Sequence, residues 1–184
     1  MKKNIVITIS GAHGTGKSTL ARRLAKRFNL RYVSAGGIFR ELARKYNMSV
    51  EEFGRYCEKN YDVDRQIDKL IQDEAKKGNV ILDGQLSWYF AKDYAHLKIL
   101  LKAPLEVRIK RIALRDGIDY ESALKATTAR EESEQKRYKE IYNISEIPCC
   151  VFDVVLDTSK YGLQSIENIL ATIVEELDAS STEG

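Results

Sequence analysis

Short apolar runs recur along the chain, separated by longer segments in which apolar side chains have helical spacing. Residues 4–10 have the sequence NIVITIS, a β-branched and nearly uninterrupted apolar run. This composition predicts a strand buried on both faces, as in a parallel sheet. Similar runs at 79–83, 97–103 and 151–157 predict further buried strands, and 31–34 predicts a shorter one.

The segments between these runs predict helices. In residues 17–28, Leu20, Leu24 and Phe28 recur at helical spacing, with arginine and lysine on the opposite side. Pro104 occupies a favoured first-turn position, and a glycine at a helix end favours termination. The other predicted helical segments are 36–77, in three pieces, 104–116, ended by Gly117, and 164–177.

One highly charged segment, 119–143, lacks a broad apolar face, and we expect an exposed pair of helices there. Strands that alternate with helices predict an α/β domain with a central parallel sheet and right-handed crossovers. With no repeat and no linker to divide the chain, residues 1–177 are expected to form one domain. Residues 178–184 are expected to be a flexible tail.

Composition excludes several classes of protein. The 184 residues carry a formal net charge of +3, which does not by itself indicate a nucleic acid or membrane partner. The apolar runs are far shorter than the roughly 18 residues of a membrane span, and the N-terminus does not resemble a signal peptide. The three cysteines lack disulfide or zinc spacing, and reduced thiols in a cytoplasmic protein are expected.

A phosphate-binding motif follows the first predicted strand and opens the first predicted helix. Its glycines allow the backbone to wrap an anion with N–H groups pointing inward, and the helix N-terminus adds positive potential. Lys17 is placed to neutralise the β- and γ-phosphates, and the Ser18 hydroxyl to bind magnesium. The motif consists of Gly11, Ala12, His13, Gly14, Thr15, Gly16, Lys17 and Ser18.

A candidate magnesium-site carboxylate follows a second buried strand. Asp83 ends the run 79–83, and the carboxyl end of a parallel strand lies near the phosphate site. Asp83 is therefore expected to hold magnesium through water, as a Walker-B acid does. The alternative is an Asp-Gly pair that only forms a turn. Because GTPases, ATPases and small-molecule kinases share the phosphate-binding motif, it does not identify the reaction.

Arginines supply a sharper indication of phosphoryl transfer, which crowds negative charge into one cavity. Arg108, Arg111 and Arg115 share one helical face, and Arg130 and Arg137 share another. Three glutamates lie among them and are placed to hold the arginines while the site is empty: Glu131, Glu132 and Glu134. For Arg108 and Arg115, a solvated face of surface ion pairs is an equal alternative.

No side chain stands out as a general base. An acceptor phosphate needs none, because its oxygen is already ionised near neutral pH. A hydroxyl acceptor usually needs one. Asp64, Asp68 and Asp83 remain candidates for a base, so this pattern only mildly favours a phosphate acceptor.

Several stretches together resemble the short, archaeal-type cytidylate kinases over nearly the whole chain. The more specific ones are SAGGIFR from residue 34 and REESEQKRY from residue 130, alongside DRQID at 64–68. The resemblance implies a P-loop kinase fold, a helical acceptor-binding region at about 36–77 and a short lid at about 117–143.

The resemblance also implies roles for individual residues. Gly11 to Thr19 would hold the ATP phosphates, Arg111 would lie between the two nucleotides, and Arg130 and Arg137 would be lid arginines. Asp157 would mark the loop near the adenine end, and a structural role in a turn is an equal alternative. The implied acceptor site consists of Ser34, Gly36, Arg40, Asp64, Asp68 and Gln85. Two positions depart from the family pattern: Gln85 replaces a usual arginine, and Gly37 a usual acidic residue.

The activity implied is transfer of the ATP γ-phosphoryl group to CMP or dCMP, with Mg²⁺ required. The expected protein is a cytoplasmic monomer with a small-molecule substrate and neither a nucleic acid nor a membrane partner. Two alternatives remain. One is a kinase of another acceptor, such as AMP, UMP or a non-nucleotide phosphate. The other is an ATP-gated module that binds RNA or protein.

Overall fold

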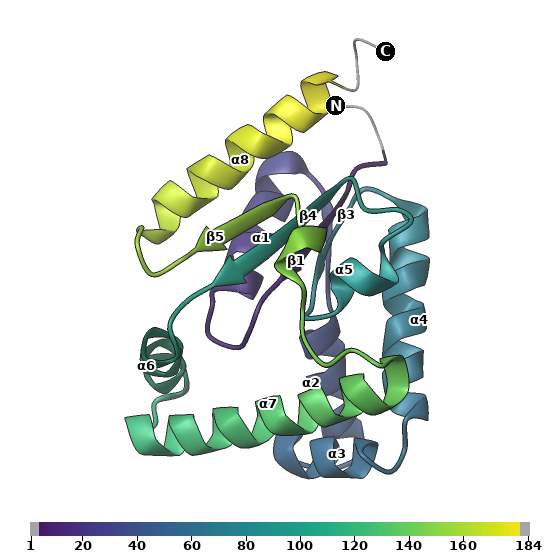
Figure 1. Cartoon of the computed structure of the whole chain (residues 1–184), viewed down its shortest axis with the longest axis vertical. Helices are drawn as coiled ribbons and strands as arrows, with labels where there is room; N and C mark the ends of the chain where they lie inside the picture. Colours follow the sequence, from purple (N-terminus) through teal and green to yellow (C-terminus); the bar gives the residue numbers. More distant parts are fainter. Residues whose placement is uncertain (1–3, 181–184) are drawn as a thin grey trace.

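A five-stranded parallel sheet forms the centre of the computed structural model, which describes residues 4–180 (Figure 1). The strand order is β2-β3-β1-β4-β5. The strands are β1 Val6–Ser10, β2 Arg31–Ser34, β3 Val80–Asp83, β4 Leu97–Lys102 and β5 Val154–Asp157. All five predicted strands are therefore present, and the predicted α/β architecture with a central parallel sheet is confirmed.

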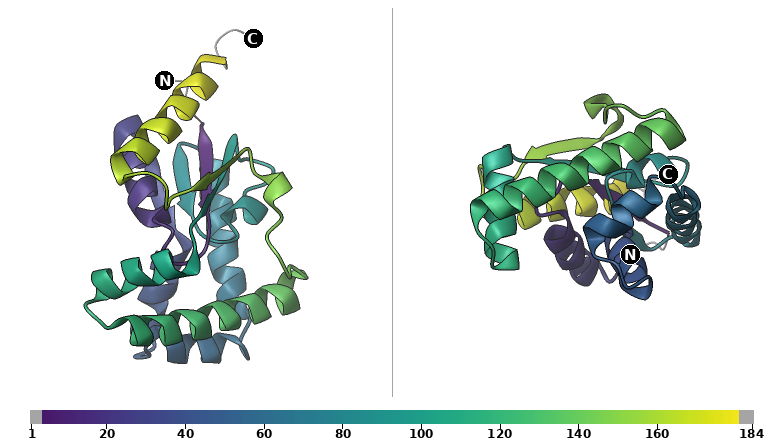
Figure 2. Two further views of the ribbon diagram at one scale, coloured as in Figure 1. Left: turned by 60° about the vertical axis from the view of Figure 1, so that its left-hand side comes forward. Right: turned by 90° about the horizontal axis from the view of Figure 1, so that it is seen from below.

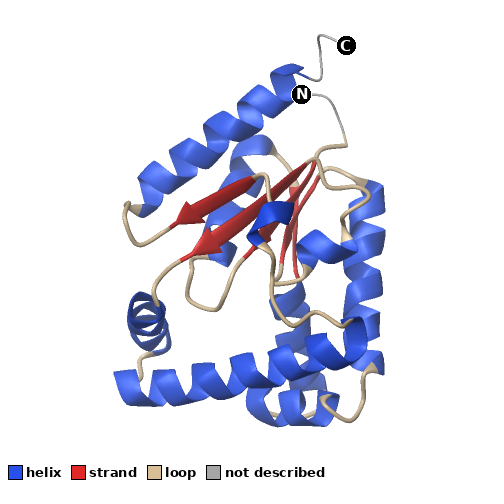
Figure 3. Cartoon of the chain, viewed as in Figure 1, coloured by secondary structure: helices blue, strands red, loops and turns tan. Residues whose placement is uncertain are grey.

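Helices lie on both faces of the sheet (Figure 3). The side chains of β1 and β3 alternate between two apolar cores, one on each face. Ile7, Ile9 and Ile81 pack against helices α1, Lys17–Phe28, and α8, Leu163–Ser180. Val6, Val80 and Leu82 pack on the other side against the helices that follow β2. Burial on both faces explains why these strands are almost entirely apolar.

The second core includes three helices between β2 and β3, as the sequence predicted. They are α2 Ala35–Lys45, α3 Val50–Cys57 and α4 Asp62–Lys77. Ser34 begins α2 by accepting a hydrogen bond from the Gly37 N–H at 3.1 Å. Ser49 and Glu52 form a capping box that begins α3. A short helix that the sequence did not predict, α5 Ser87–Phe90, follows β3.

Helices α6, Leu105–Asp116, and α7, Tyr120–Tyr142, lie beyond the carboxyl ends of the strands (Figures 1 and 2). The prediction of two exposed helices within residues 119–143 is wrong, because α7 is one continuous helix of 23 residues. Asp119 caps its start, and no glycine or proline interrupts it before Asn143. Nor is it simply exposed, since Glu134 and Arg137 are buried.

The structure also describes the C-terminal helix and the three cysteines. Helix α8 continues three residues past the predicted end, to Ser180, and the rest of the expected tail lies outside the described residues. All three cysteines are free, with Cys57 buried and Cys149 and Cys150 exposed. Within residues 4–180, no helix is long and apolar enough to cross a membrane. No cluster of metal-binding side chains forms in that range either.

Leu24 tests the core between α1 and the sheet, where its side chain is completely buried. Leu24→Ala is expected to lower the free energy of unfolding by about 2–5 kcal/mol, because it leaves a cavity. Urea denaturation of both proteins measures this loss. The matched control is Leu114→Ala, since Leu114 is 87% exposed and its loss is expected to cost less than about 0.5 kcal/mol. Equal effects of the two changes would contradict the described packing.

Candidate active site

The loop between β1 and α1 has the backbone shape of a phosphate cradle. Gly11, Gly14 and Gly16 have φ angles of 145°, 80° and 91°, a region that other residues rarely adopt. A Cβ at Gly14 would lie 2.5 Å from the carbonyl oxygen of Arg108, so the loop passes close against α6. No side chain caps the start of α1, which leaves its N-terminal N–H groups directed at the loop.

Lys17 is the first residue of α1, and its side chain reaches back to this loop. Its Nζ donates a hydrogen bond to the Ala12 carbonyl at 2.9 Å. Burial lowers the pKa of Lys17, and the carboxylate of Asp83 opposes that shift. Thr15 also donates to the Ala12 carbonyl, at 2.8 Å, whereas Thr19 is exposed. An ammonium group held by a single carbonyl is free to exchange that partner for a phosphate oxygen.

Three hydroxyl groups converge on one carboxylate oxygen of Asp83 at the end of β3. Ser18 donates to Asp83 Oδ2 at 2.6 Å. Tyr32 and Ser34, from β2, donate to the same oxygen at 2.8 and 3.1 Å. The sequence pointed to Ser18 and Asp83 separately, and the parallel register brings them together. Tyr32 was missed, because a lone tyrosine in a short strand carries no motif.

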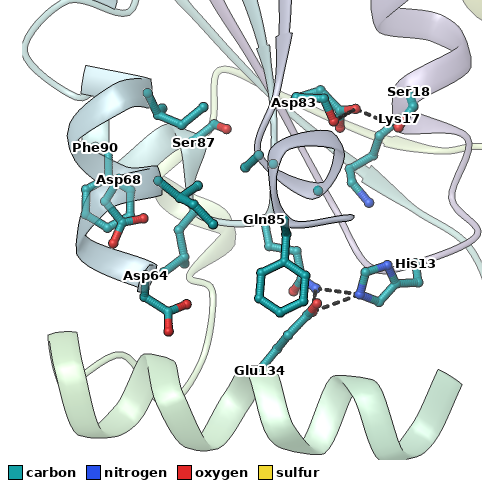
Figure 4. Close-up of a pocket in the computed structure, with 18 of the residues that line it drawn as sticks. His13, Lys17, Ser18, Asp64, Asp68, Asp83, Gln85, Ser87, Phe90 and Glu134 are labelled. Atoms are coloured by element: carbon teal, nitrogen blue, oxygen red, sulfur yellow. Dashed lines mark hydrogen bonds and ion pairs between the residues drawn. The ribbon is translucent and has the colours of Figure 1, made fainter. Parts of the chain in front are cut away.

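A pocket of about 110 Å³ extends from this site toward α4 and α5 (Figure 4). Its phosphate end contains Lys17, Ser18 and Asp83, and its other end contains Asp64 and Asp68 on α4. Figure 4 shows these two groups on opposite sides of Gln85 and Glu134. The predicted residues brought together in its wall are His13, Lys17, Ser18, Ser34, Gly36, Arg40, Asp64, Asp68, Asp83, Gln85 and Arg130.

Arg40 and Arg130 reach this pocket from different elements. Arg40 extends from α2, and Arg130 from α7, where its Nε donates to Glu134 at 3.0 Å. Partial burial lowers the pKa of Arg40, and the nearby charges of Arg130 and Arg115 lower it further. Such mutual repulsion indicates a place where an anion would be stabilised.

Other predicted site arginines lie elsewhere. Arg111 donates to the Thr158 hydroxyl at 2.9 Å and to its carbonyl at 2.7 Å, next to the phosphate-binding loop and outside the pocket. Arg137 is buried and forms an ion pair with Asp64. It lines a separate hollow between α3 and α7. Asp157 accepts hydrogen bonds from Ser159 in a local turn.

Glu134 connects α7 to the phosphate-binding loop. Its carboxylate lies 2.8 Å from His13 Nε2 and accepts hydrogen bonds from Gln85 and Arg130. Burial opposes its charge, but His13, Arg130 and Arg137 outweigh that effect and lower the pKa of Glu134 to about 2. Glu134 therefore forms an ion pair with Arg130, one of the arginines that the sequence placed among these glutamates.

A second junction lies one turn earlier on α7. Glu131 accepts from the Arg108 guanidinium at 2.7 Å and from the His13 backbone N–H at 3.2 Å. Arg108 also donates to the His13 carbonyl at 2.9 Å, and it is buried, so it does not belong to a solvated face. Arg115, in contrast, belongs to a solvated face, since it is exposed and forms an ion pair with the adjacent Asp116. Nothing in the sequence marked residue 13 as the contact for both glutamates.

Solved structures with this fold include small-molecule kinases. Shikimate kinase from Bacteroides thetaiotaomicron superposes with a TM-score of 0.62 at 14% identity, covering 93% of this chain and 98% of that one. A gluconokinase from Sinorhizobium meliloti has a TM-score of 0.61 at 15% identity, covering 98% and 99%. These similarities identify the fold, a P-loop kinase fold, as the sequence predicted.

Sequence comparison is more specific. The cytidylate kinase of Methanocaldococcus jannaschii is 44% identical over 94% of this chain and 99% of its own length. The cytidylate kinase of Methanopyrus kandleri is 44% identical over 95% of this chain and 95% of its own length. The cytidylate kinase of Pyrococcus horikoshii is 38% identical over 96% of this chain and 92% of its own length. A model of the cytidylate kinase-like family matches residues 6–160. With the phosphate cradle and the pocket beside it, these similarities show that the chain belongs to the cytidylate kinase-like family.

Proposed function

We propose that this protein transfers the γ-phosphoryl group of ATP to CMP, and to dCMP, producing ADP and CDP or dCDP. One observation carries the proposal: a single pocket is lined both by Lys17, Ser18 and Asp83 of the phosphate site and by polar groups of α2 and α4 that could contact an acceptor. The family to which the chain belongs supports the same reaction.

The cradle fits the phosphates of ATP. Backbone N–H groups of the loop, the start of α1 and Lys17 would bind the β- and γ-phosphate oxygens. The oxygens of Ser18 and Asp83, 2.6 Å apart, are the hard ligands that Mg²⁺ prefers. When bound there, Mg²⁺ would neutralise charge on the β- and γ-phosphates.

The remaining cations are placed to receive the acceptor. Arg40 and Arg130 would bind the CMP phosphate and the phosphoryl group in transfer. An oxygen of the CMP phosphate attacks the γ-phosphorus, the bond to the bridging oxygen breaks, and that oxygen leaves on ADP. Because the attacking oxygen is already ionised, the reaction needs no general base. Figure 4 shows Asp64 and Asp68 on the other side of Gln85 from Lys17 and Ser18.

Two segments would move during the cycle. We propose that residues 36–77 form the acceptor-binding region and that 117–143, which includes α7, acts as a lid. The lid already contacts the cradle through Glu131 and Glu134. Bound phosphates would take over Arg130 from Glu134 and hold the lid closed, which excludes water from the reacting phosphoryl group.

An acceptor panel tests the activity directly. We expect purified protein with ATP and Mg²⁺ to form ADP rapidly with CMP and dCMP, and more slowly with UMP, AMP or GMP. Coupled detection of ADP gives kcat/KM for each acceptor. Preference for another monophosphate would retain the kinase and change the acceptor. ATP binding without turnover on any acceptor would contradict the proposal and favour an ATP-gated binding module.

Arg130 tests the role of the lid. Arg130→Ala is expected to reduce kcat with CMP by about 10²-fold or more, because the transition state loses a positioned cation. The control is Lys125→Ala, which removes an exposed positive charge from the same helix. Steady-state kinetics compare the two variants. If Arg130→Ala keeps normal kcat, the lid arginine takes no part in catalysis.

Asp83 tests the metal site. Asp83→Asn keeps an oxygen near Ser18 but removes the negative charge, so we expect a higher Mg²⁺ concentration for half-maximal activity. Activity at saturating CMP, measured as a function of Mg²⁺, gives that concentration. Asp93→Asn, which changes an exposed carboxylate after α5, is expected to match the unmodified protein. An unchanged Mg²⁺ dependence for Asp83→Asn would place the metal elsewhere.

A further inference from the structure

Glu134 places a negative charge in the wall of a pocket that otherwise favours phosphate. The residue is 7% exposed, and it lines the same pocket as Lys17 and Ser18 of the phosphate site. An ion pair with Arg130, at 3.0 Å, keeps its carboxyl group ionised in spite of burial. A carboxylate has the same sign of charge as the substrate, so its position in this wall opposes the binding of a nucleotide.

Three donors from different parts of the fold converge on this carboxylate. Arg130 of α7 donates to Oε1, and the amide of Gln85, which follows β3, donates to Oε2. Nε2 of His13, in the phosphate-binding loop, lies 2.8 Å from Oε2 (Figure 4). Because Oε2 belongs to a charged acceptor, we assign the ring proton of His13 to Nε2. Several donors directed at one anion are also the arrangement that stabilises a phosphoryl group.

The attachment of α7 to the loop does not depend on Glu134 alone. One turn earlier, Glu131 accepts hydrogen bonds from the backbone N–H of His13 at 3.2 Å and from Arg108 at 2.7 Å. In the part of the chain that the structure describes, the pocket wall includes Glu134 but not Glu131. Glu131 therefore connects the helix to the loop, and Glu134 can leave its donors while that connection persists.

We propose that Glu134 is a positioning residue that holds Arg130 in the place of a phosphoryl group and competes with the nucleotide for it. When ATP binds, an oxygen of its γ-phosphate replaces the carboxylate as the partner of Arg130. After the transfer, that phosphoryl group leaves on the phosphorylated product, and the carboxylate returns. This inference rests on the proposed function and extends it, because it gives a carboxylate the role of lowering the affinity for ATP.

Competition of this kind has a measurable size. The apparent affinity for a ligand falls in proportion to the fraction of protein in which its binding group is available. If Glu134 leaves Arg130 available in about a tenth of the molecules, ATP binds about tenfold more weakly than it would without the carboxylate. The same competition favours release of the phosphorylated product, a step that limits turnover in many enzymes.

Glu134→Gln provides the first test, because it removes the charge with little change in shape. Calorimetry without an acceptor gives Kd for ATP and for ADP. We expect Kd for ATP to fall about tenfold, and Kd for ADP, which lacks the γ-phosphate, to change less than about threefold. Glu132→Gln removes an exposed charge from the same helix and is expected to change neither constant. Equal or weaker binding of ATP to Glu134→Gln would overturn the proposal.

A double-mutant cycle tests whether Glu134 acts through Arg130. In Arg130→Ala, the further change Glu134→Gln is expected to leave Kd for ATP within about threefold, because the group for which the carboxylate competes is gone. The same gain in affinity with and without Arg130 would show that Glu134 only repels phosphate. That result would refute its role as a positioning residue.

A spectroscopic test uses the unmodified protein and does not depend on the folding of a Glu134 variant. The Nε–H resonance of Arg130 reports the contact with Glu134, and its absence from the spectrum of Arg130→Ala identifies it. We expect saturating ATP to shift this resonance and saturating ADP to leave it in place. A resonance that ATP does not move would contradict the exchange of partners.

These measurements require ATP but no acceptor. They therefore decide the role of Glu134 even if no monophosphate supports turnover, which is the result that contradicts the proposed function. A protein that binds no ATP at all would overturn both.

Discussion

Cations gathered to bind phosphate repel one another when no phosphate is present, and the arrangement of α7 follows from that constraint. Lys17, Arg40 and Arg130 face one pocket from three elements. The carboxylate of Glu134 is buried in the same pocket, where His13, Arg130 and Arg137 outweigh the effect of burial and lower its pKa to about 2. A charged group can be buried there because it replaces, within the protein, the charge that a nucleotide would bring.

The carboxylates of α7 also connect this helix to the phosphate-binding loop at the end of the sheet. Glu131 and Glu134 are one turn apart on α7, and both contact His13 in the phosphate-binding loop. Arg108 adds a third connection, from α6 to the loop and to Glu131. The loop itself is placed by the sheet, where β1 pairs with β3 so that Ser18 reaches Asp83. Polar and charged contacts therefore connect helix α7, the phosphate-binding loop and the carboxyl end of β3.

The sequence predicted those features that depend on residues close together in the chain, namely the buried strands and the phosphate-binding loop. Buried strands are recognisable from runs such as 4–10, and the cradle from glycines that must adopt positive φ. The partners within the cradle follow from parallel register. What the sequence left open depends on long-range contacts. Charge spacing alone does not distinguish the buried pair of Arg137 and Asp64 from a solvated pair, and no periodicity reveals that α7 is buried through polar side chains.

Gln85 stands where the family pattern usually has an arginine, and this difference concerns the middle of the pocket. Its amide donates to Glu134 and lies 3.3 Å from His13, in the middle of the pocket (Figure 4). An arginine at this position would add a positive charge to the pocket, so we expect Gln85 to bind the proposed acceptor phosphate less tightly than an arginine would. It does not alter the part of the pocket wall that α4 forms, where Asp64 and Asp68 lie. The glutamine at position 85 is thus expected to affect phosphate binding more than it affects the part of the pocket that α4 forms.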